Sequence, residues 1–500
     1  MPPTTRSSGR SVTDAPNWAT LLAHWRTGPG PLHTRLSAAL RACIHAGNLG
    51  PGDALPAERT LADLLLVSRS TVVTAVETLE EEGWVTRRQG SGTHVAATAP
   101  RRAEVLTLRS PVPHPRSNAA DRGALSASTV PAELDLTIAV PSLTEPQRQQ
   151  LQAASADAFW DSLYYPLGLP ELRARLAAQY TQSGLPTTPE QIIITNGAQQ
   201  AISVIAQVFL RRGDVALLET PTYFGAIDVF RAAGATLLGV PVSPDGMQAE
   251  AFADALRSGS PRLAFLTPTF QNPTGTVLSA QTRERLAQQI MDTGLPTIED
   301  DTLIDLGFIR PGGGTDRLPP RLSAYVPESS VINVGSLSKL YWAGLRVGWM
   351  RAPRPLLAQL AQAKTLADFG SSLPAQAIAL NLLADLPGLR QARRAAVTPA
   401  RDLLVRLLRE HLPDWSFTVP AGGQFLWIEL PTPHVTAFTL FAQSYGLRLF
   451  PGASMGVEPL PDTFLRIPFT LPTEHLPEAV RRLAQAWQAY RARGGAARLA

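Results

Sequence analysis

The stretch Val331-Ile-Asn-Val-Gly-Ser-Leu-Ser-Lys339 decides how the larger part of this 500-residue chain is interpreted. Its first four residues form a short, mainly apolar run that is typical of a buried strand. The run leads directly into Ser336-Leu337-Ser338-Lys339. In open parallel sheets, ligands gather beyond the carboxyl ends of the strands, so the sequence predicts that Lys339 lies at a functional edge.

Lysine is rare in this chain, since its 45 basic residues include only Lys339 and Lys364. A guanidinium stays protonated, whereas a partly buried lysine can lose its proton and condense with an aldehyde as a Schiff base. Lys364 falls on a predicted helix and is interpreted as an incidental lysine. The same explanation is open for Lys339, so its neighbours must decide.

The composition excludes several classes of protein. The length predicts two or three domains. A single Cys43 excludes a disulfide framework and a cluster of thiolate metal ligands, and no metal site is predicted. No apolar run is as long as a membrane span, and MPPTTRSSGR at the N-terminus lacks the apolar core of a signal peptide. We therefore expect a soluble, cytoplasmic protein; the net charge of +4 is weak evidence for a polyanionic partner.

The first hundred residues predict a small DNA-binding module. Residues 1–30 form a polar arm with one short amphipathic stretch. Residues 31–96 have helical apolar spacing, followed by two short strands around Gln89-Gly90-Ser91-Gly92. The Ser68 hydroxyl is placed to cap a helix that begins at Arg69. Three helices and a hairpin predict a winged helix-turn-helix.

A linker at 97–134, rich in Pro, Ala, Ser and Arg, separates this module from a domain at 135–493. That domain has the α/β pattern of short apolar runs alternating with helices, which predicts a largely parallel sheet covered on both faces. The expected strands are 192–195, 215–219, 236–240, 263–267, 297–301, 331–334 and 348–350. Residues 376–493, with amphipathic helices around Phe425–Leu430 and Phe464–Ile467, predict a smaller α+β lobe.

Polar residues follow several of the expected strands. Thr195-Asn-Gly-Ala-Gln-Gln200 precedes a helix and offers backbone N–H groups to a phosphate, although ordinary strand-to-helix turns have similar residues. Tyr223 either covers a flat ligand or fills the core. Asn272 is presented by a turn rich in Pro and Gly.

An acidic run and an arginine complete the set. Glu299-Asp300-Asp301 are either solvated acids or include a partner for a protonated ring nitrogen. Arg346 is either a surface arginine or a second ligand for the phosphate that Ser336 binds. Phosphate donors, an aromatic plate, an amide, an acid and an amine nucleophile together match pyridoxal 5'-phosphate (PLP).

The motifs then point to one family. Asn272-Pro-Thr-Gly275, Ser336-Leu-Ser-Lys339 and Leu465-Arg-Ile467 resemble the fold-type I aminotransferases. Leu55-Pro-Ala-Glu-Arg59, Val67-Ser-Arg-Ser-Thr71 and Arg88-Gln-Gly-Ser-Gly-Thr93 resemble the GntR winged-helix domain. Both on one chain, in this order, resemble the MocR (GabR-like) subfamily of GntR regulators.

The resemblance implies roles for particular residues. Lys339 forms the Schiff base, Asp300 holds the pyridinium N–H, and Arg466 grips an amino acid α-carboxylate. Asn272 binds the phenolic oxygen and Tyr223 stacks on the ring. The implied phosphate ligands are Gly197, Ala198, Gln199, Ser336 and Arg346. The implied DNA contacts are Arg59, Ser68, Arg69, Ser70, Thr71, Arg87, Arg88 and Gly90. A homodimer follows as well, with Tyr165 as a candidate for reaching the partner's phosphate.

Two positions depart from the family. The usual tyrosine two or three residues after the pyridine-pairing acid is replaced by Thr302 and Leu303, which argues against fast transamination, although a tyrosine from elsewhere could substitute. The arginine of the GABA-responsive member is replaced by Gly225, which disfavours a γ-carboxylate ligand. Our leading hypothesis is a PLP-dependent transcription regulator that senses an amino acid or amine. The alternatives are an active aminotransferase with an accessory DNA-binding domain and a DNA-binding scaffold without cofactor.

Overall fold

A computed structural model of the chain describes residues 22, 25, 31–45, 49, 53–81, 84–88, 92–96, 131–141, 143–156, 164–308, 318–326 and 330–492. The chain divides into two compact units, Met1–Glu104 with Ala496–Ala500, and Val105–Gly495. The arm expected at 1–30, apart from Leu22 and Trp25, lies outside the described residues, as does the linker as far as residue 130.

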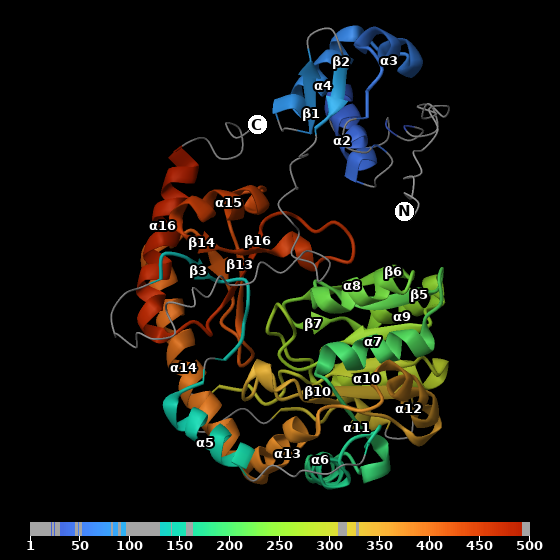
Figure 1. The fold of residues 1–500 in the computed structure, drawn as a ribbon, viewed down its shortest axis with the longest axis vertical. Coiled ribbons are helices and arrows are strands. Elements are labelled where there is room, and N and C mark those ends of the chain that lie inside the picture. Colours follow the sequence, from blue (N-terminus) through green and yellow to red (C-terminus); the bar gives the residue numbers. More distant parts are fainter. Residues whose placement is uncertain are drawn as a thin grey trace, which may run out of the picture. The chain divides into compact units, whose positions relative to one another are not determined.

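The first unit, blue in Figure 1, is a winged helix-turn-helix. It consists of α2 (Leu32–His45), α3 (Glu58–Leu65), α4 (Arg69–Glu81), β1 (Val85–Arg88) and β2 (Gly92–Val95). The strands pair antiparallel, with Val85 opposite Val95. Apolar residues at helical spacing meet in one core, which includes Leu36, Leu40, Leu61, Val72 and Leu79. This periodicity is why the sequence pattern predicted the module.

The second unit contains an eight-stranded sheet in the order β4-β11-β10-β9-β8-β5-β6-β7. All seven predicted runs are strands of this sheet. The four pairs that join β6, β5, β8, β9 and β10 are parallel, so their carboxyl ends share one edge, whereas β11 runs antiparallel to its neighbours. The bounds are β4 (Ile192–Thr195), β5 (Val215–Thr220), β6 (Thr236–Ser243), β7 (Gly246–Met247), β8 (Leu263–Leu266), β9 (Thr297–Asp300), β10 (Val331–Ser336) and β11 (Gly348–Arg351).

Helices cover both faces of the sheet, because alternate residues of each strand are apolar and buried on opposite sides (Figure 1). Ala216 and Leu218 pack against one set of helices, and Leu217 between them packs against another. The first set is α7 (Ala198–Phe209), α8 (Phe224–Ala232) and α12 (Arg354–Asp368). The opposite set is α6 (Pro170–Gln182), α9 (Ala249–Gly259), α10 (Ala280–Thr293), α11 (Leu322–Tyr325) and α13 (Leu373–Leu382).

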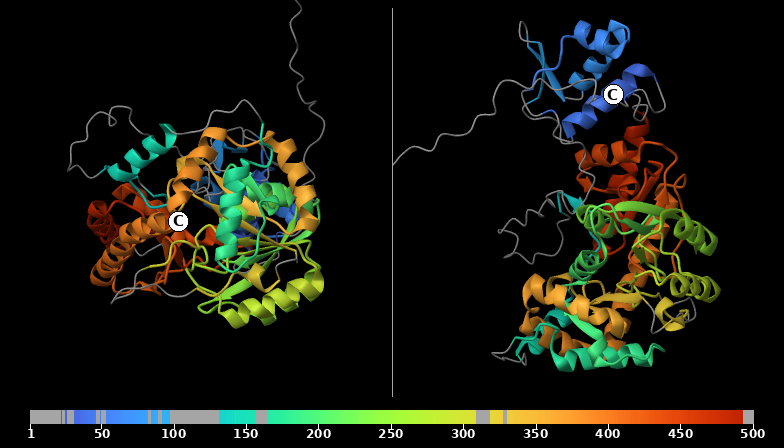
Figure 2. Two further views of the ribbon diagram at one scale, coloured as in Figure 1. Left: turned by 90° about the horizontal axis from the view of Figure 1, so that it is seen from below. Right: turned by 90° about the vertical axis from the view of Figure 1, so that its right-hand side faces the viewer.

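A smaller lobe, red in Figures 1 and 2, is built on the antiparallel sheet β12-β13-β16-β15. The long helix α14 joins the lobes: Leu386 and Leu389 pack in the large lobe, and Leu404 and Leu408 in the small one. The segments expected near amphipathic helices, Phe425–Leu430 and Phe464–Ile467, are themselves strands. The remaining bounds are β3 (Leu134–Asp135), α5 (Glu145–Ala156), α14 (Leu386–His411), β12 (Ser416–Phe417), β13 (Phe425–Glu429), α15 (Val435–Ala442), β14 (Leu447–Arg448), β15 (Phe450–Pro451), β16 (Phe464–Pro468) and α16 (Leu476–Ala492).

Leu134 pairs in parallel with Leu447, so β3 adds to the small lobe before the chain continues to the large one.

Within the described part of the chain, no helix has the length and apolar character needed to cross a membrane.

Candidate cofactor site

A cavity of about 260 Å³ opens at the carboxyl edge of the large sheet. Its lining includes nine of the predicted cofactor or effector residues, which come from seven separate stretches of the chain: Ala198, Gln199, Tyr223, Asn272, Asp300, Ser336, Lys339, Arg346 and Arg466. Five of these stretches meet because β4, β5, β8, β9 and β10 end at this edge. Arg346 comes just before the antiparallel β11, and Arg466 lies within β16 of the smaller lobe.

Lys339 is the amine of this cavity. Burial, followed by the positive charges of Arg466 and Arg393, lowers the pKa of Lys339 to about 8, while Asp300 acts in the opposite direction. The Nζ atom donates a hydrogen bond of 2.8 Å to the carbonyl oxygen of Ala139. At neutral pH roughly a tenth of such an amine is unprotonated, against less than about a thousandth for an ordinary lysine. Lys339 therefore has the nucleophilic form that capture of an aldehyde needs.

The three acids at the end of β9 have different surroundings. Asp300 lines the cavity. Burial raises its pKa, and a hydrogen bond of 2.9 Å from the Thr302 backbone N–H acts in the opposite direction. Glu299 and Asp301 instead accept hydrogen bonds from Asn333, of 2.8 and 3.1 Å. Because successive side chains of a strand point to opposite faces of the sheet, Asp300 faces the cavity, whereas Glu299 and Asp301 face Asn333.

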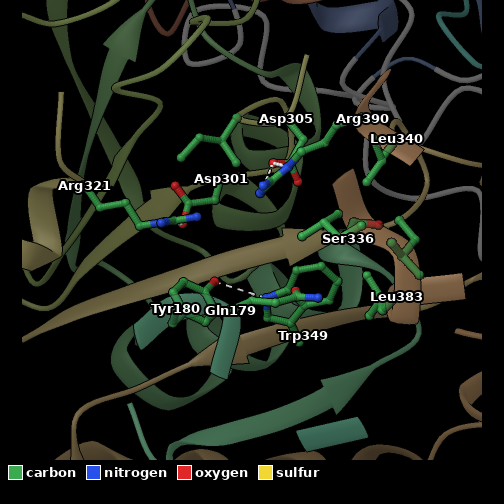
Figure 3. Close-up of a pocket in the computed structure, with 13 residues that line it drawn as sticks. Gln179, Tyr180, Asp301, Asp305, Arg321, Ser336, Leu340, Trp349, Leu383 and Arg390 are labelled. Carbon is green, nitrogen blue, oxygen red and sulfur yellow. Dashed lines mark hydrogen bonds and ion pairs between the residues drawn. The ribbon is translucent and has the colours of Figure 1, made fainter. Parts of the chain in front are cut away.

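Asp301 belongs to a second, much smaller cavity of about 30 Å³, drawn in Figure 3. Figure 3 shows Arg321 beside Asp301, to which Arg321 Nε donates at 2.8 Å. Trp349 Nε1 donates to the Tyr180 hydroxyl at 3.0 Å in the same cavity. Ser336 lines both cavities, so this polar cluster supports the floor of the larger one.

The turn between β4 and α7 forms one end of the larger cavity. Gly197 has φ 88° and ψ 168°, a region that only glycine adopts readily. A Cβ atom there would lie 2.7 Å from Arg346 Nη2, which donates to the Asn196 carbonyl oxygen at 2.8 Å. The guanidinium therefore packs directly against the turn. An arginine and the first N–H groups of α7 are donors that suit a phosphate dianion. The Ser336 hydroxyl, also on the lining, donates to the Val347 carbonyl oxygen at 3.2 Å.

Tyr223 and Asn272 lie on the cavity wall. The Tyr223 hydroxyl donates to Gln199 Oε1 at 3.0 Å. Its ring covers Gly225 so closely that a Cβ at 225 would lie 2.5 Å from Tyr223 Cζ. Asn272 Oδ1 is buried and has no hydrogen-bond partner among the described residues, so its amide can serve a ligand. Among those residues Tyr223 is the only tyrosine on the lining, so none replaces the donor missing at Thr302 and Leu303.

Arg466 on β16 is the third cation on the described lining of the cavity, after Lys339 and Arg346. It is 3% exposed and lies between two aromatic rings, with Cζ 4.3 Å from the centre of Phe425 and 4.2 Å from that of Phe450. Arg466 Nη2 donates to the Thr137 carbonyl oxygen at 2.7 Å. Burial lowers its pKa to about 9. A guanidinium held in this way can bind a carboxylate through two parallel hydrogen bonds.

The predicted DNA contacts form a second cluster, in the first unit. The Thr71 backbone N–H donates to Ser68 Oγ at 3.2 Å, which confirms the predicted cap of α4. Arg59, Ser68, Arg69 and Ser70 are exposed, and Thr71 is partly exposed. The start of α4 therefore presents polar side chains to solvent.

The arginines of the hairpin differ from Arg69. Arg87 forms ion pairs with Glu58 at 3.2 Å and with Glu80 at 3.4 Å, whereas Arg69 has only a 3.5 Å contact with Glu58. Arg88 lies in β1, and Gly90 lies outside the described residues. A phosphate would have to compete with two carboxylates for Arg87.

Two family models match the chain: the gntR family of bacterial regulatory proteins at residues 32–95 and aminotransferase class I and II at residues 137–483. The regulator YisV of Bacillus subtilis is 30% identical over 81% of this chain and 86% of its own length. The probable rhizopine catabolism regulatory protein MocR of Rhizobium meliloti is 31% identical over 77% of this chain and 78% of its own. This chain belongs to the MocR-like regulators.

The second unit of this MocR-like chain also resembles a solved enzyme. The α-aminoadipate aminotransferase LysN of Thermus thermophilus, in complex with N-(5'-phosphopyridoxyl)-L-leucine, has a TM-score of 0.66 and 29% identity, over 75% of this chain and 97% of the enzyme. Aminotransferases of class I and II depend on PLP, so the family confirms the predicted cofactor. When bound, PLP supplies an aldehyde carbon for the amine and an electron-withdrawing ring.

Some members of the site could not be seen in the sequence. The carbonyl groups of Thr137 and Ala139 contact Arg466 and Lys339 through backbone atoms that no residue pattern encodes. Lys364, interpreted as incidental, lies on α12 as expected but is 0% exposed and ion-paired. The rarity of lysine in this chain is the sequence signal that distinguishes Lys364 from an ordinary helix residue.

Proposed function

We propose that PLP, alone or with an amino acid or amine, binds in the cavity around Lys339 and thereby controls how the winged helix-turn-helix of this GntR-type regulator binds double-stranded DNA. The cavity carries this proposal, because it combines an amine whose pKa is lowered to about 8 with a buried acid and a guanidinium beside a glycine turn. These groups fit the aldehyde, ring nitrogen and phosphate of PLP.

The proposed roles are those implied by the resemblance. Lys339 captures the aldehyde, and Asp300, whose Oδ1 accepts from the Thr302 backbone N–H, holds a proton at the ring nitrogen. Gly197, Ala198, Gln199, Ser336 and Arg346 hold the phosphate, Asn272 the phenolic oxygen, and Tyr223 the ring face. Arg466 binds the effector's α-carboxylate.

The effector pocket beside Arg466 is lined mainly by apolar residues. Apart from the residues assigned to PLP, the lining includes Ile138, Val140, Phe224 and Leu303. The similar enzyme is called an α-aminoadipate aminotransferase and was solved with a leucine derivative, so its pocket accepts an apolar side chain as well as a dicarboxylic one. We therefore expect amino acids with neutral, apolar side chains to bind better than dicarboxylic ones.

DNA recognition is proposed at the start of α4, where Arg69, Ser70 and Thr71 are solvent-exposed or partly so. An arginine there can read guanine with two hydrogen bonds, and hydroxyls can hold phosphates. The domain limits 31–96 and 135–493 contain the two family matches and belong to this proposal, as do a cytoplasmic location and a homodimer with Tyr165 at the partner's site.

The decisive experiment titrates the purified protein with PLP and compares it with Lys339→Ala. Wild type should develop a visible absorption band that the variant lacks, and the genomic fragments it retains should differ with and without PLP. If wild type never develops the band, the site is not a PLP site and the cofactor-free scaffold is correct.

The competing function is an active aminotransferase. Thr302 and Leu303 replace the donor tyrosine, and no other tyrosine of the described lining is placed to replace it, so we expect no sustained turnover with mixtures of amino acids and 2-oxo acids. Sustained turnover would favour the enzyme.

A further inference from the structure

Lys364 is a buried cation that the proposed roles leave unexplained. It lies on α12, is 0% exposed, and its Nζ donates to Asp368 Oδ1 at 2.5 Å. Removing a charge from water is costly unless a partner compensates for it, and breaking such a pair leaves an isolated buried charge. Lys364 and Asp368 are therefore a unit.

Asp368 connects this ion pair to the turn between β4 and α7 through hydrogen bonds. Its Oδ2 atom accepts from Asn196 Nδ2 at 2.8 Å and from Gln200 Nε2 at 2.7 Å, while Oδ1 also accepts from the Gly370 N–H at 3.0 Å. One carboxylate thus joins the end of α12 to a turn about 170 residues earlier in the chain, at Asn196 and Gln200.

Asn196, which is bound to Asp368, is also hydrogen-bonded to Arg346 of the cavity. Its carbonyl oxygen accepts from Arg346 Nη2 at 2.8 Å, and its backbone N–H donates to Gln200 Oε1 at 2.7 Å. Its neighbour Gly197 packs against the Arg346 guanidinium. Lys364, Asp368 and Asn196 are not part of the cavity lining, so they can act on a ligand only through the turn and Arg346.

The positive charge of Lys364 has a second effect, on the electrostatics of the phosphate end of the cavity. The hydrogen bonds from Lys364 and Gln200 outweigh burial and lower the pKa of Asp368, so the carboxylate is ionised. An anion behind the turn would repel a phosphate dianion on its other side. The ammonium group of Lys364 cancels that charge without entering the cavity.

We propose that Lys364 and Asp368 are positioning residues that orient the 195–198 turn and Arg346 for the phosphate group of PLP. The inference rests on the proposed function, since it needs PLP in this cavity. It adds that the second lysine of the chain serves the same cofactor as the first, from behind the phosphate end.

The test compares PLP with pyridoxal, which has the same aldehyde and ring but no phosphate. Dissociation constants of both are measured for wild type, Lys364→Met and Asp368→Asn. Lys364→Met should bind PLP about tenfold more weakly, a loss in the range of couplings within one hydrogen-bonded network, because it breaks the network and leaves the Asp368 anion behind the turn. Asp368→Asn should lose less PLP affinity, because the repelling anion is removed together with its hydrogen bonds. Pyridoxal binding should change less than about twofold, because the ring and aldehyde contacts are untouched.

Arg482→Met is the matched control, because Arg482 forms an ion pair of the same i,i+4 spacing with Glu478, at 2.7 Å in α16. It should leave both dissociation constants unchanged. Melting temperatures are recorded for every variant, and if Lys364→Met does not fold, the neutral pair Lys364→Met with Asp368→Asn is measured in its place.

The outcomes are distinct. A selective loss of PLP affinity supports the positioning role. An equal loss for PLP and pyridoxal, or no loss for either, overturns it, because the pair then acts on the whole fold or on nothing in the site. If wild type binds neither compound, the proposed function itself fails.

Discussion

Gly197→Ala tests the phosphate end of the cavity most directly. At φ 88° and ψ 168° an alanine costs about 1–3 kcal/mol of backbone strain. Its Cβ would also lie 2.7 Å from Arg346 Nη2, so the guanidinium must move and weaken its 2.8 Å bond to the Asn196 carbonyl. Hydrogen bonds to charged groups contribute about 1.5–3 kcal/mol. We therefore expect PLP to bind roughly 10- to 150-fold more weakly.

Gly213→Ala separates strain from crowding. Gly213 has φ 91°, but nothing lies within 4 Å of its added Cβ. Both variants should melt at a lower temperature, and only Gly197→Ala should lose PLP affinity in an absorbance titration. If the two variants bind PLP equally well, Arg346 and this turn do not hold the phosphate, and our reasoning is refuted.

Further predictions concern the amine, the effector arginine and the DNA-binding helix. Because burial and Arg466 lower the pKa of Lys339 to about 8, the rate of PLP capture should rise with pH through a midpoint near 8, and a stopped-flow midpoint near 10 would contradict this. Arg466→Gln removes a positive charge and should move that midpoint upward while abolishing the spectral response to amino acids; an unchanged midpoint would rule out the charge effect. Arg69→Ala should weaken operator binding by roughly 1–3 kcal/mol if the side chain reads a base, and equal loss on all DNA sequences would make it a phosphate contact. Ser68→Ala should lower the stability of the first unit by about 1 kcal/mol in thermal melts, because the cap of α4 is lost.

Much of the fold was predictable from local patterns. The seven apolar runs became strands because helices cover both faces of the sheet, so its strands need apolar residues on both sides. Helical spacing in the first unit likewise produced its core. The boundaries differ by a few residues, as for β6, which continues from Val240 to Ser243. The end of a strand is set by its hydrogen bonds to the neighbouring strands, and the length of an apolar run does not predict where those hydrogen bonds stop.

Lys339, Asp300 and Asn272 were predictable as site residues, because each follows an apolar run and parallel strands end at a common edge. The strand alternation that faces Asp300 into the cavity and Asp301 away from it is also local. Which of the two faces lines the cavity could not be predicted from the sequence, because both faces of this sheet are buried under helices and only the packed structure distinguishes them.

Local patterns were enough to predict the two modules, the order of the strands along the chain and the residue types at the strand ends. Which groups meet depends on how the whole chain packs: Arg466 contacts the Thr137 carbonyl, and Lys364 is linked through Asp368 to the turn at Asn196. Periodicity and turn residues act over a few positions, whereas the contacts of Arg466 with Thr137 and of Asp368 with Asn196 join groups 329 and 172 residues apart. Such contacts form only when whole helices and sheets pack, and no short pattern in the chain specifies them.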